Sequence, residues 1–256
     1  MPNELGEFLR ARRADAALAP PASAGAGRRR ISGLRREEIA TLAGISVDYY
    51  VRLEQGRETH PSDAVLDALA RVLRLSADGR EHLQRLRDGG AAPARRADDP
   101  GLAARMAALV AAVGPRPAYV LDRLGNMVAA TPEGLALYDG FAELPPGERN
   151  TCRYLLTDPR APRTFVEWED LARGAVAHLR AANAADLQDP ALRALVAELS
   201  EASPRFVEWW GEHVVARRRA AATHVRTAGG EVVARRFEVL HLPEDGLRMT
   251  IWLDAA

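Results

Sequence analysis

The sequence predicts an all-α domain of five helices followed by an α+β domain in which helices cover an antiparallel sheet. Three observations favour this division. Residues 1–88 contain short amphipathic segments bounded by helix-capping residues. Residues 102–256 begin and end with strand-like runs and carry helical segments between them. Residues 89–101 are rich in Ala, Gly and Pro without apolar periodicity, which is typical of a linker.

Caps and apolar periodicity define the helices of the first domain. The residues expected to begin helices are Asn3, Ser46, Ser62 and Ser76. Gly44 and Gly56 follow two helical segments, where a tight turn needs a permissive backbone. Between the first two helices, residues 14–32 form a Pro- and Ala-rich stretch that we expect to be an exposed loop. The predicted helices are residues 3–13, 35–43, 47–55, 61–74 and 76–87.

The second domain alternates between two kinds of periodicity. A helix over 102–113 comes first, and apolar residues at helical spacing define further helices around residues 165–179, 192–199 and 206–213. Gly-containing pairs, such as Gly229-Gly230 and Asp245-Gly246, separate the strand-like runs as hairpin turns do. The predicted strands are residues 117–122, 126–130, 222–227, 231–242 and 247–253.

The charge is balanced overall but not along the chain. All 35 cations are arginines, they match 35 acids, and the net charge is zero. Residues 1–57 nevertheless hold ten arginines against seven acids. Five of these arginines lie within nine residues that contain no acid, and such a patch attracts phosphate even on a neutral protein. The five are Arg28, Arg29, Arg30, Arg35 and Arg36.

Several classes of protein are disfavoured. Cys152 is the single cysteine, so the chain can form neither a disulfide framework nor a metal site built on cysteines. The histidines are not spaced as metal ligands. No run approaches the ~20 apolar residues that a membrane span needs, so we expect a cytoplasmic protein. Glu167 and Asp170 share a helix face, but no nucleophile elbow, zinc-protease motif or phosphate loop accompanies them. The sequence therefore predicts no metal, no membrane contact and no enzymatic activity.

The segment from Arg35 to Arg57 has the pattern of two helices bent around a glycine. Apolar residues are expected to lock the pair together, at Ile39, Leu42, Ile45, Tyr50 and Leu53. The second helix then turns its first residues outward, which is how such a pair presents a helix to the DNA major groove. The candidate DNA contacts are Arg36, Ser46, Val47, Asp48, Tyr49, Arg52 and Arg57.

These residue types suit distinct contacts. Arg52 can bind guanine through two hydrogen bonds, and Asp48 can accept from a cytosine amino group. Tyr49 and Ser46 can donate to phosphate, while Arg36 and Arg57 flank the helix pair as phosphate clamps. Two short helices around a glycine also occur in proteins that never bind DNA. Docking to a protein partner therefore remains an alternative.

Residues 39–57 resemble the helix-turn-helix of the XRE, or lambda-repressor-like, regulators, with an Ala-Gly turn and a Leu-Glu-x-Gly-Arg close. Residues 33–57, 149–159 and 203–215 are similar to the MmyB-like subgroup, whose C-terminal sensor is PAS-like. The resemblance implies a DNA-binding transcription regulator with Tyr50 in the core. It also implies a homodimer on a pseudo-palindromic double-stranded DNA operator. The stretch 14–32 is longer than in a minimal domain of this family.

The resemblance further implies that the second domain binds a small apolar effector, such as a fatty acid, and no other cofactor. The candidate lining residues are Tyr138, Phe141, Leu155, Phe165, Trp168, Val176, Leu179, Phe206, Trp209 and Trp210. Aromatic residues at helical spacing are also typical of plain core, so a second domain that only dimerises or docks a protein partner stays open. Arg217, Arg218 and Arg219 are expected to be a solvated charge run that complements a helix C-terminus.

Overall fold

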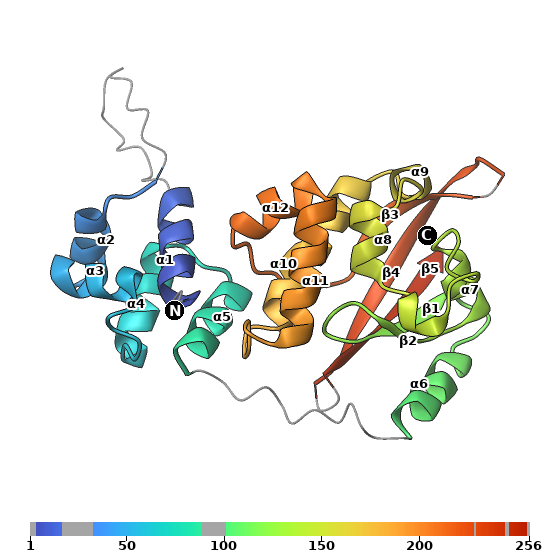
Figure 1. Cartoon of the computed structure of the whole chain (residues 1–256), viewed down its shortest axis with the longest axis horizontal. Helices are drawn as coiled ribbons and strands as arrows, with labels where there is room; N and C mark the ends of the chain where they lie inside the picture. Colours follow the sequence, from blue (N-terminus) through green and yellow to red (C-terminus); the bar gives the residue numbers. More distant parts are fainter. Residues whose placement is uncertain (1–3, 17–32, 89–100, 228, 244–245, 255–256) are drawn as a thin grey trace, which may run out of the picture. The chain divides into compact units, whose positions relative to one another are not determined.

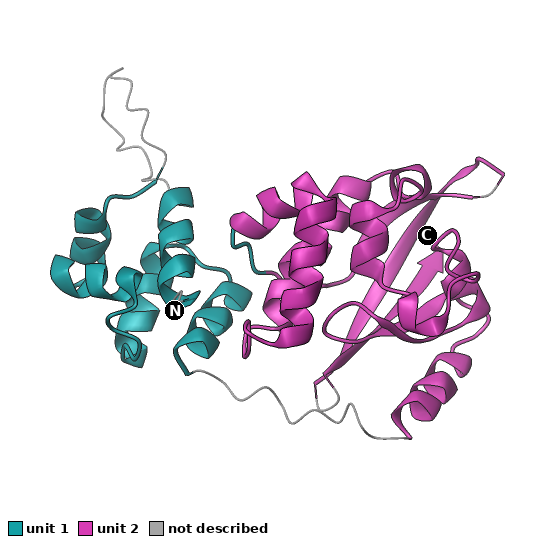
Figure 2. Cartoon of the chain, in the orientation of Figure 1, with its two compact units in different colours: residues 1–90, 212–215 teal, residues 91–211, 216–256 magenta. Residues whose placement is uncertain are grey.

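The computed structural model describes residues 4–16, 33–88, 101–227, 229–243 and 246–254. The chain divides into two compact units: residues 1–90 with 212–215, and residues 91–211 with 216–256 (Figure 2). Several sequence-based expectations lie outside the described residues. These are the Asn3 cap, most of the 14–32 stretch with Arg28, Arg29 and Arg30, the linker before Gly101, and Asp245 of the last turn.

The described part of the first unit contains five helices, as the sequence predicts (Figure 1). Apolar side chains from all five are almost fully buried, among them Phe8, Ile39, Leu53, Leu69 and Leu83. The helices are α1 (Glu4–Asp15), α2 (Arg36–Ala43), α3 (Val47–Gln55), α4 (Asp63–Val72) and α5 (Ala77–Asp88).

The turn between α2 and α3 follows from its capping residues. Gly44 ends α2 with a φ of 70°, a left-handed conformation that glycine adopts at little cost. Ser46 begins α3, and its hydroxyl oxygen accepts the Tyr49 backbone N–H at 3.1 Å. Leu42 was expected to lock the two helices, but it is 56% exposed, whereas Ile39, also expected to lock them, and Ala40 are almost fully buried. This expectation is wrong because the register of α2 places Leu42 on its outer side.

The described part of the second unit is an α+β fold with one antiparallel sheet in the order β2-β1-β5-β4-β3. This confirms the predicted PAS-like class. The strands are β1 (Ala118–Leu121), β2 (Met127–Ala130), β3 (Ala221–Arg226), β4 (Val232–Leu242) and β5 (Leu247–Asp254). The helices are α6 (Leu102–Ala111), α7 (Pro132–Ala136), the 3₁₀ helix η1 (Pro146–Glu148), α8 (Thr151–Thr157), α9 (Ala161–Thr164), α10 (Trp168–Ala182), α11 (Pro190–Ala202) and α12 (Pro204–Gly211).

The two faces of the sheet are covered by different helices. On one face, Met106 and Val110 of α6 pack against Val120, Leu247 and Met249. On the other face, α8, α9 and α10 lie over the strands (Figure 1). Since side chains alternate along a strand, β5 sends Arg248, Thr250 and Trp252 toward these helices. Register places three further side chains on the same face: Tyr119 beside Thr250, Phe237 beside Trp252, and His241 beside Arg248.

Phe165 departs from its expected position. The sequence suggested that it shares a helix with Trp168, Val176 and Leu179. Instead it follows α9 in extended conformation, and it forms a bridge with Val225 of the edge strand β3. The chain is drawn out there because the Val166 N–H donates to the His224 carbonyl at 3.0 Å. Phe165 is nevertheless buried, on the helix-covered side of the sheet.

Candidate functional site

Helix α3 divides sharply into a buried and an exposed side. Tyr50, Leu53 and Glu54 are buried in the first unit. Val47 is 39% exposed, and the side chain of Asp48 is 76% exposed. The N-terminal half of the helix therefore presents polar and apolar groups to solvent, which is the surface a groove-reading helix uses.

Asp48, Tyr49 and Arg52 form one cluster on the exposed side of α3. Arg52 pairs with Asp48 one helical turn earlier, at 2.8 Å between nitrogen and oxygen. Its guanidinium carbon lies 5.8 Å from the centroid of the Tyr49 ring. An exposed pair at this spacing contributes only about 0.3–0.5 kcal/mol. Arg52 can therefore exchange Asp48 for another partner at little cost.

Glu54, on the opposite side of α3, joins three helices. Its Oε1 accepts from Arg13 of α1 at 2.6 Å, and its Oε2 accepts from Arg36 of α2 at 2.7 Å. Arg10 adds a hydrogen bond to the Glu54 carbonyl at 3.0 Å. Burial favours the neutral acid, but the hydrogen bonds from Arg13 and Arg36 outweigh it and lower the pKa of Glu54. Glu54 was not among the predicted site residues, although it stands in the Leu-Glu-x-Gly-Arg close that carries the family resemblance.

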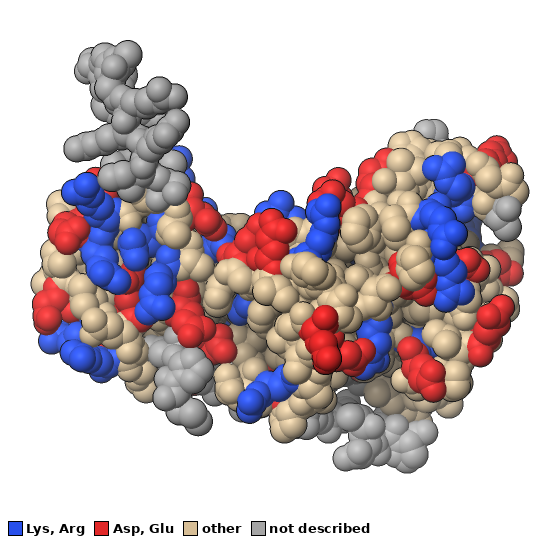
Figure 3. Space-filling view, turned by 45° about the horizontal axis from the view of Figure 1, so that its top comes forward, with Lys and Arg blue, Asp and Glu red and all other residues tan. Residues whose placement is uncertain are grey.

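Arg36, Ser46 and Arg57 surround the exposed end of α3. Arg36 donates its Nε to Glu54, yet 44% of its side chain stays exposed. The Ser46 oxygen caps the helix while its hydroxyl hydrogen is left to donate. Arg57 is exposed directly after Gly56. Figure 3 shows basic side chains gathered on one face of the helical unit, interspersed with acidic ones.

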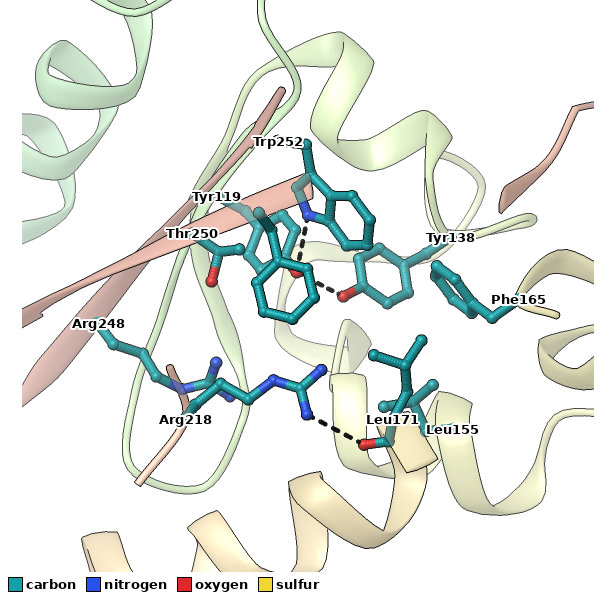
Figure 4. A pocket seen from close by; sticks show the side chains of 10 residues that line it. Tyr119, Tyr138, Leu155, Phe165, Leu171, Arg218, Arg248, Thr250 and Trp252 are labelled. Atoms are coloured by element: carbon teal, nitrogen blue, oxygen red, sulfur yellow. Dashed lines mark hydrogen bonds between the residues drawn. The ribbon is translucent and has the colours of Figure 1, made fainter. Parts of the chain in front are cut away.

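A second candidate site is a cavity between the sheet and its covering helices (Figure 4). Its volume is about 20 Å³. One water needs roughly 10–15 Å³ in this measure, so a larger ligand requires side chains to move. The lining residues are Tyr119, Tyr138, Leu155, Phe165, Leu171, Arg218, Phe237, Arg248, Thr250 and Trp252.

Three of the predicted lining residues, Tyr138, Leu155 and Phe165, line this cavity. Phe141 packs behind Tyr138, with ring centroids 4.9 Å apart, and the Trp168 Nε1–H donates to the Leu155 carbonyl at 2.5 Å. The other five do not line it, and they lie on α10 and α12: Val176, Leu179, Phe206, Trp209 and Trp210. The residues that sequence reasoning missed lie mostly on the strands, where alternation alone does not mark a cavity.

Hydrogen bonds organise the aromatic wall of the cavity. The Tyr138 hydroxyl donates to the Tyr119 hydroxyl at 2.8 Å, and the Trp252 Nε1–H donates to the same oxygen at 3.2 Å. Burial raises the pKa of Tyr138 well above its usual range, so its phenol stays protonated. These bonds fix the positions of three rings that belong to different elements.

Two arginines form the polar wall. Arg218 was expected in a solvated charge run, but it lies in the cavity wall because the chain just before it runs along α10, where the Ala216 N–H donates to the Ala177 carbonyl at 3.4 Å. Its guanidinium carbon lies 4.9 Å from the centroid of the Phe237 ring. Arg248 of β5 is only 8% exposed. Burial lowers the pKa of Arg218, and the nearby charge of Arg248 lowers it further.

The carboxylate pair considered for catalysis has a structural explanation. Glu167 precedes α10 and accepts hydrogen bonds from the backbone N–H of His224 and the hydroxyl of Thr223, both at 2.7 Å. These bonds lower the pKa of Glu167 to about 2. It thereby ties α10 to β3, while Asp170 is exposed. Among the described residues, no group of three or more His, Cys, Asp or Glu side chains is placed to hold a metal ion.

A helix-turn-helix unit joined to an α+β unit with an internal cavity defines a ligand-binding transcription regulator. Comparison with known families agrees: residues 4–83 match the helix-turn-helix domain, and residues 102–255 match the MmyB-like transcription regulator ligand binding domain. The chain belongs to this MmyB-like family. Neither matched family is catalytic.

No curated protein matches the chain. Within the described ranges, no helix has the length and apolarity to cross a membrane.

Proposed function

We propose that the chain regulates transcription by placing α3 in the major groove of a specific DNA sequence. The observation that carries this proposal is the division of α3. Tyr50, Leu53 and Glu54 anchor one side in the core, while Asp48 and Arg52 stay exposed on the other. A rigidly held helix with a free polar N-terminal half suits base reading.

Each exposed group has a proposed partner. Arg52 leaves Asp48 and binds guanine, a contact that discriminates by about 1–3 kcal/mol. Asp48, once released, accepts from cytosine, and Val47 contacts a thymine methyl group. Phosphate contacts come from Ser46, Tyr49, Arg36 and Arg57, and they fix the position of the helix on the duplex.

The proposal extends to assembly and location. A homodimer in the cytoplasm would bind a pseudo-palindromic operator, with half-sites about one helical turn apart. The support for this is the general symmetry between such operators and two-fold regulators, together with the family of the chain.

For the second unit we propose a small effector with an apolar, fatty-acid-like body. The family description as a ligand-binding domain and the aromatic walls of the cavity support it. Opening the cavity requires side chains such as Leu155 and Leu171 to move. A competing function, in which this unit only dimerises or docks a protein partner, is favoured by the small volume of the cavity.

Two arginines, one within α3 and one just after it, test the DNA proposal. Duplexes bound by the wild type, Arg52→Ala and Arg57→Ala are selected from a random library, and their affinities are measured at several salt concentrations. Arg52→Ala should relax the preference at one or two base pairs. Arg57→Ala should weaken binding to all sequences about equally. It should also reduce the slope of affinity against salt concentration by the amount expected for one phosphate contact. An unchanged sequence preference in Arg52→Ala would remove the role we give to this residue.

A further inference from the structure

The cavity contains buried polar atoms that have no partner. The Nε of Arg248 and the Oγ1 of Thr250 are both buried without a hydrogen bond. They lie two residues apart on β5, and both side chains line the cavity (Figure 4). Buried polar groups are nearly always satisfied in proteins, so two unsatisfied groups in one cavity indicate a missing partner.

The charge of the site is also unbalanced. Within the described part of the chain, neither Arg218 nor Arg248 forms an ion pair with a carboxylate. The Arg218 side chain donates a long hydrogen bond to the Leu171 carbonyl, at 3.4 Å. Two neighbouring cations in a partly buried cavity repel each other and are poorly solvated. An anion between them would relieve both costs.

The remaining polar side chains of the cavity can each donate a hydrogen bond. Tyr119 accepts from Tyr138 and Trp252, so its own hydroxyl hydrogen is left to donate. Thr250 adds a second hydroxyl, and the guanidinium groups carry donors alone. A ligand that satisfies this set must be an acceptor, which excludes a cation.

Arg218 is held in place by groups that surround its backbone. Its N–H donates to Nδ1 of His178 at 3.1 Å, and its carbonyl accepts from Nε2 of His241 at 3.1 Å. Burial and the surrounding arginines keep the pKa of His178 well below its usual range, so its ring can accept. Gly174 leaves room for the guanidinium, because a Cβ there would lie 2.5 Å from an Arg218 nitrogen. Arg218 is thus positioned before any ligand arrives, although the apolar part of the cavity must still open.

We propose that Arg218 and Arg248 form an anion site that binds the carboxylate of an effector with an apolar body. The inference rests on the proposed effector function, and it adds the chemical group that the cavity recognises. A planar carboxylate matches the forked donors of arginine. Its body then lies among Tyr138, Phe165 and Trp252. Recognition depends on the charge of the ligand as well as on its apolar surface.

The test compares acids with neutral analogues of the same shape. The melting temperature of the full chain is measured at constant ionic strength with acetate, benzoate and dodecanoate, and with ethanol, benzyl alcohol and dodecanol. At least one carboxylate should raise the melting temperature and bind about tenfold more tightly than its alcohol, because it gains charge-assisted hydrogen bonds. The three acids distinguish a bare anion, an aromatic acid and a fatty acid as the ligand.

Variants assign the effect to the two arginines. Arg218→Gln and Arg248→Gln should each abolish the preference for the acid. Arg236→Gln should keep it, because Arg236 is an exposed residue on the opposite face of the sheet, paired with Glu238. Gly174→Ala should weaken acid binding by displacing the Arg218 guanidinium. If no carboxylate outperforms its alcohol, or if the Gln variants keep the preference, the anion site is refuted.

A ligand-free measurement separates binding from folding. Arg248→Met removes a buried, unpaired cation, so the empty protein should melt at a higher temperature than the wild type. A purely structural arginine would give the opposite result. Operator affinity measured in parallel distinguishes the two proposals: acid binding that leaves DNA affinity unchanged would keep the anion site and refute the effector function.

Discussion

At the scale of single residues, the first unit depends on a buried carboxylate. Glu54 binds Arg13 and Arg36 through its two oxygens, and both arginines come from other helices. The same residue follows Arg52 of the exposed cluster by two positions and faces the opposite side of α3. Its ion pairs therefore set the orientation in which α3 presents its reading side.

Replacing Glu54 by Gln should lower the free energy of unfolding by roughly 2–4 kcal/mol, because two partly buried guanidiniums lose their charged partner. Urea denaturation at pH 7 measures the change. Glu37→Gln is the matched control, since Glu37 is exposed on α2, and it should change stability by less than about 0.5 kcal/mol. Equal effects of the two substitutions would contradict this account of Glu54.

The same carboxylate predicts how stability responds to acid. The pKa of Glu54 is lower in the folded unit than its ordinary value of 4.5. Its contribution is therefore complete above pH 4.5 and is lost as pH falls through the folded value. Urea denaturation of the wild type between pH 6 and pH 3 should show this loss of stability. The Glu54→Gln variant should lack the part of the pH dependence that comes from Glu54. If the free energy of unfolding fell equally with pH in the two proteins, Glu54 would not be the source of the acid sensitivity.

At the scale of elements, caps and turns made most boundaries predictable. Ser46, Ser62 and the glycines after α2 and α3 fixed the helices of the first unit to within about two residues. The hairpin turns did the same for β3, β4 and β5. Local hydrogen bonds and backbone freedom decide these features, so the sequence pattern contains them.

The errors arose where distant contacts decide the structure. Phe165 has helical spacing from Trp168, but pairing with β3 keeps its backbone extended. Arg218 has the sequence context of a solvated charge run, and only the path of the chain along α10 buries it. For the aromatic residues, periodicity identifies the buried side, yet it does not distinguish a cavity wall from ordinary core.

A close approach between α1 and α3 gives a test at this scale. A Cβ on Gly6 would overlap the Glu54 carbonyl oxygen, so Gly6→Ala should destabilise the unit although alanine favours helices by about 1 kcal/mol. The control is Gly79→Ala in α5, where the nearest atom would lie 3.4 Å away and the helix preference should prevail. The melting temperature should fall in Gly6→Ala and rise in Gly79→Ala. A stabilising Gly6→Ala would contradict the close packing of the two helices.

At the scale of the whole molecule, one chain carries a DNA-binding domain and a ligand-binding domain. Ligand and operator binding are linked only if the effector favours one DNA-binding state over another, and such coupling is typically 1–3 kcal/mol. The family of the chain supports the presence of both activities. Their coupling is a prediction.

Removing the ligand tests this coupling. Solvent extraction of the gently desalted protein, followed by mass spectrometry, should recover an apolar acid. Gel shifts with stripped and reloaded protein should then differ in DNA affinity by about 5- to 150-fold. A mock-treated sample serves as the control. Equal affinities before and after reloading with the recovered compound would show that the cavity does not regulate DNA binding.

Fluorescence anisotropy measures whether α3 gives the protein sequence-specific DNA binding. Wild-type protein is titrated onto a duplex selected from a random library and onto a scrambled duplex of the same composition, at one salt concentration near 150 mM. The selected duplex should bind about 10³-fold more tightly or better, as it does for specific regulators. Equal affinity for the two duplexes would contradict it.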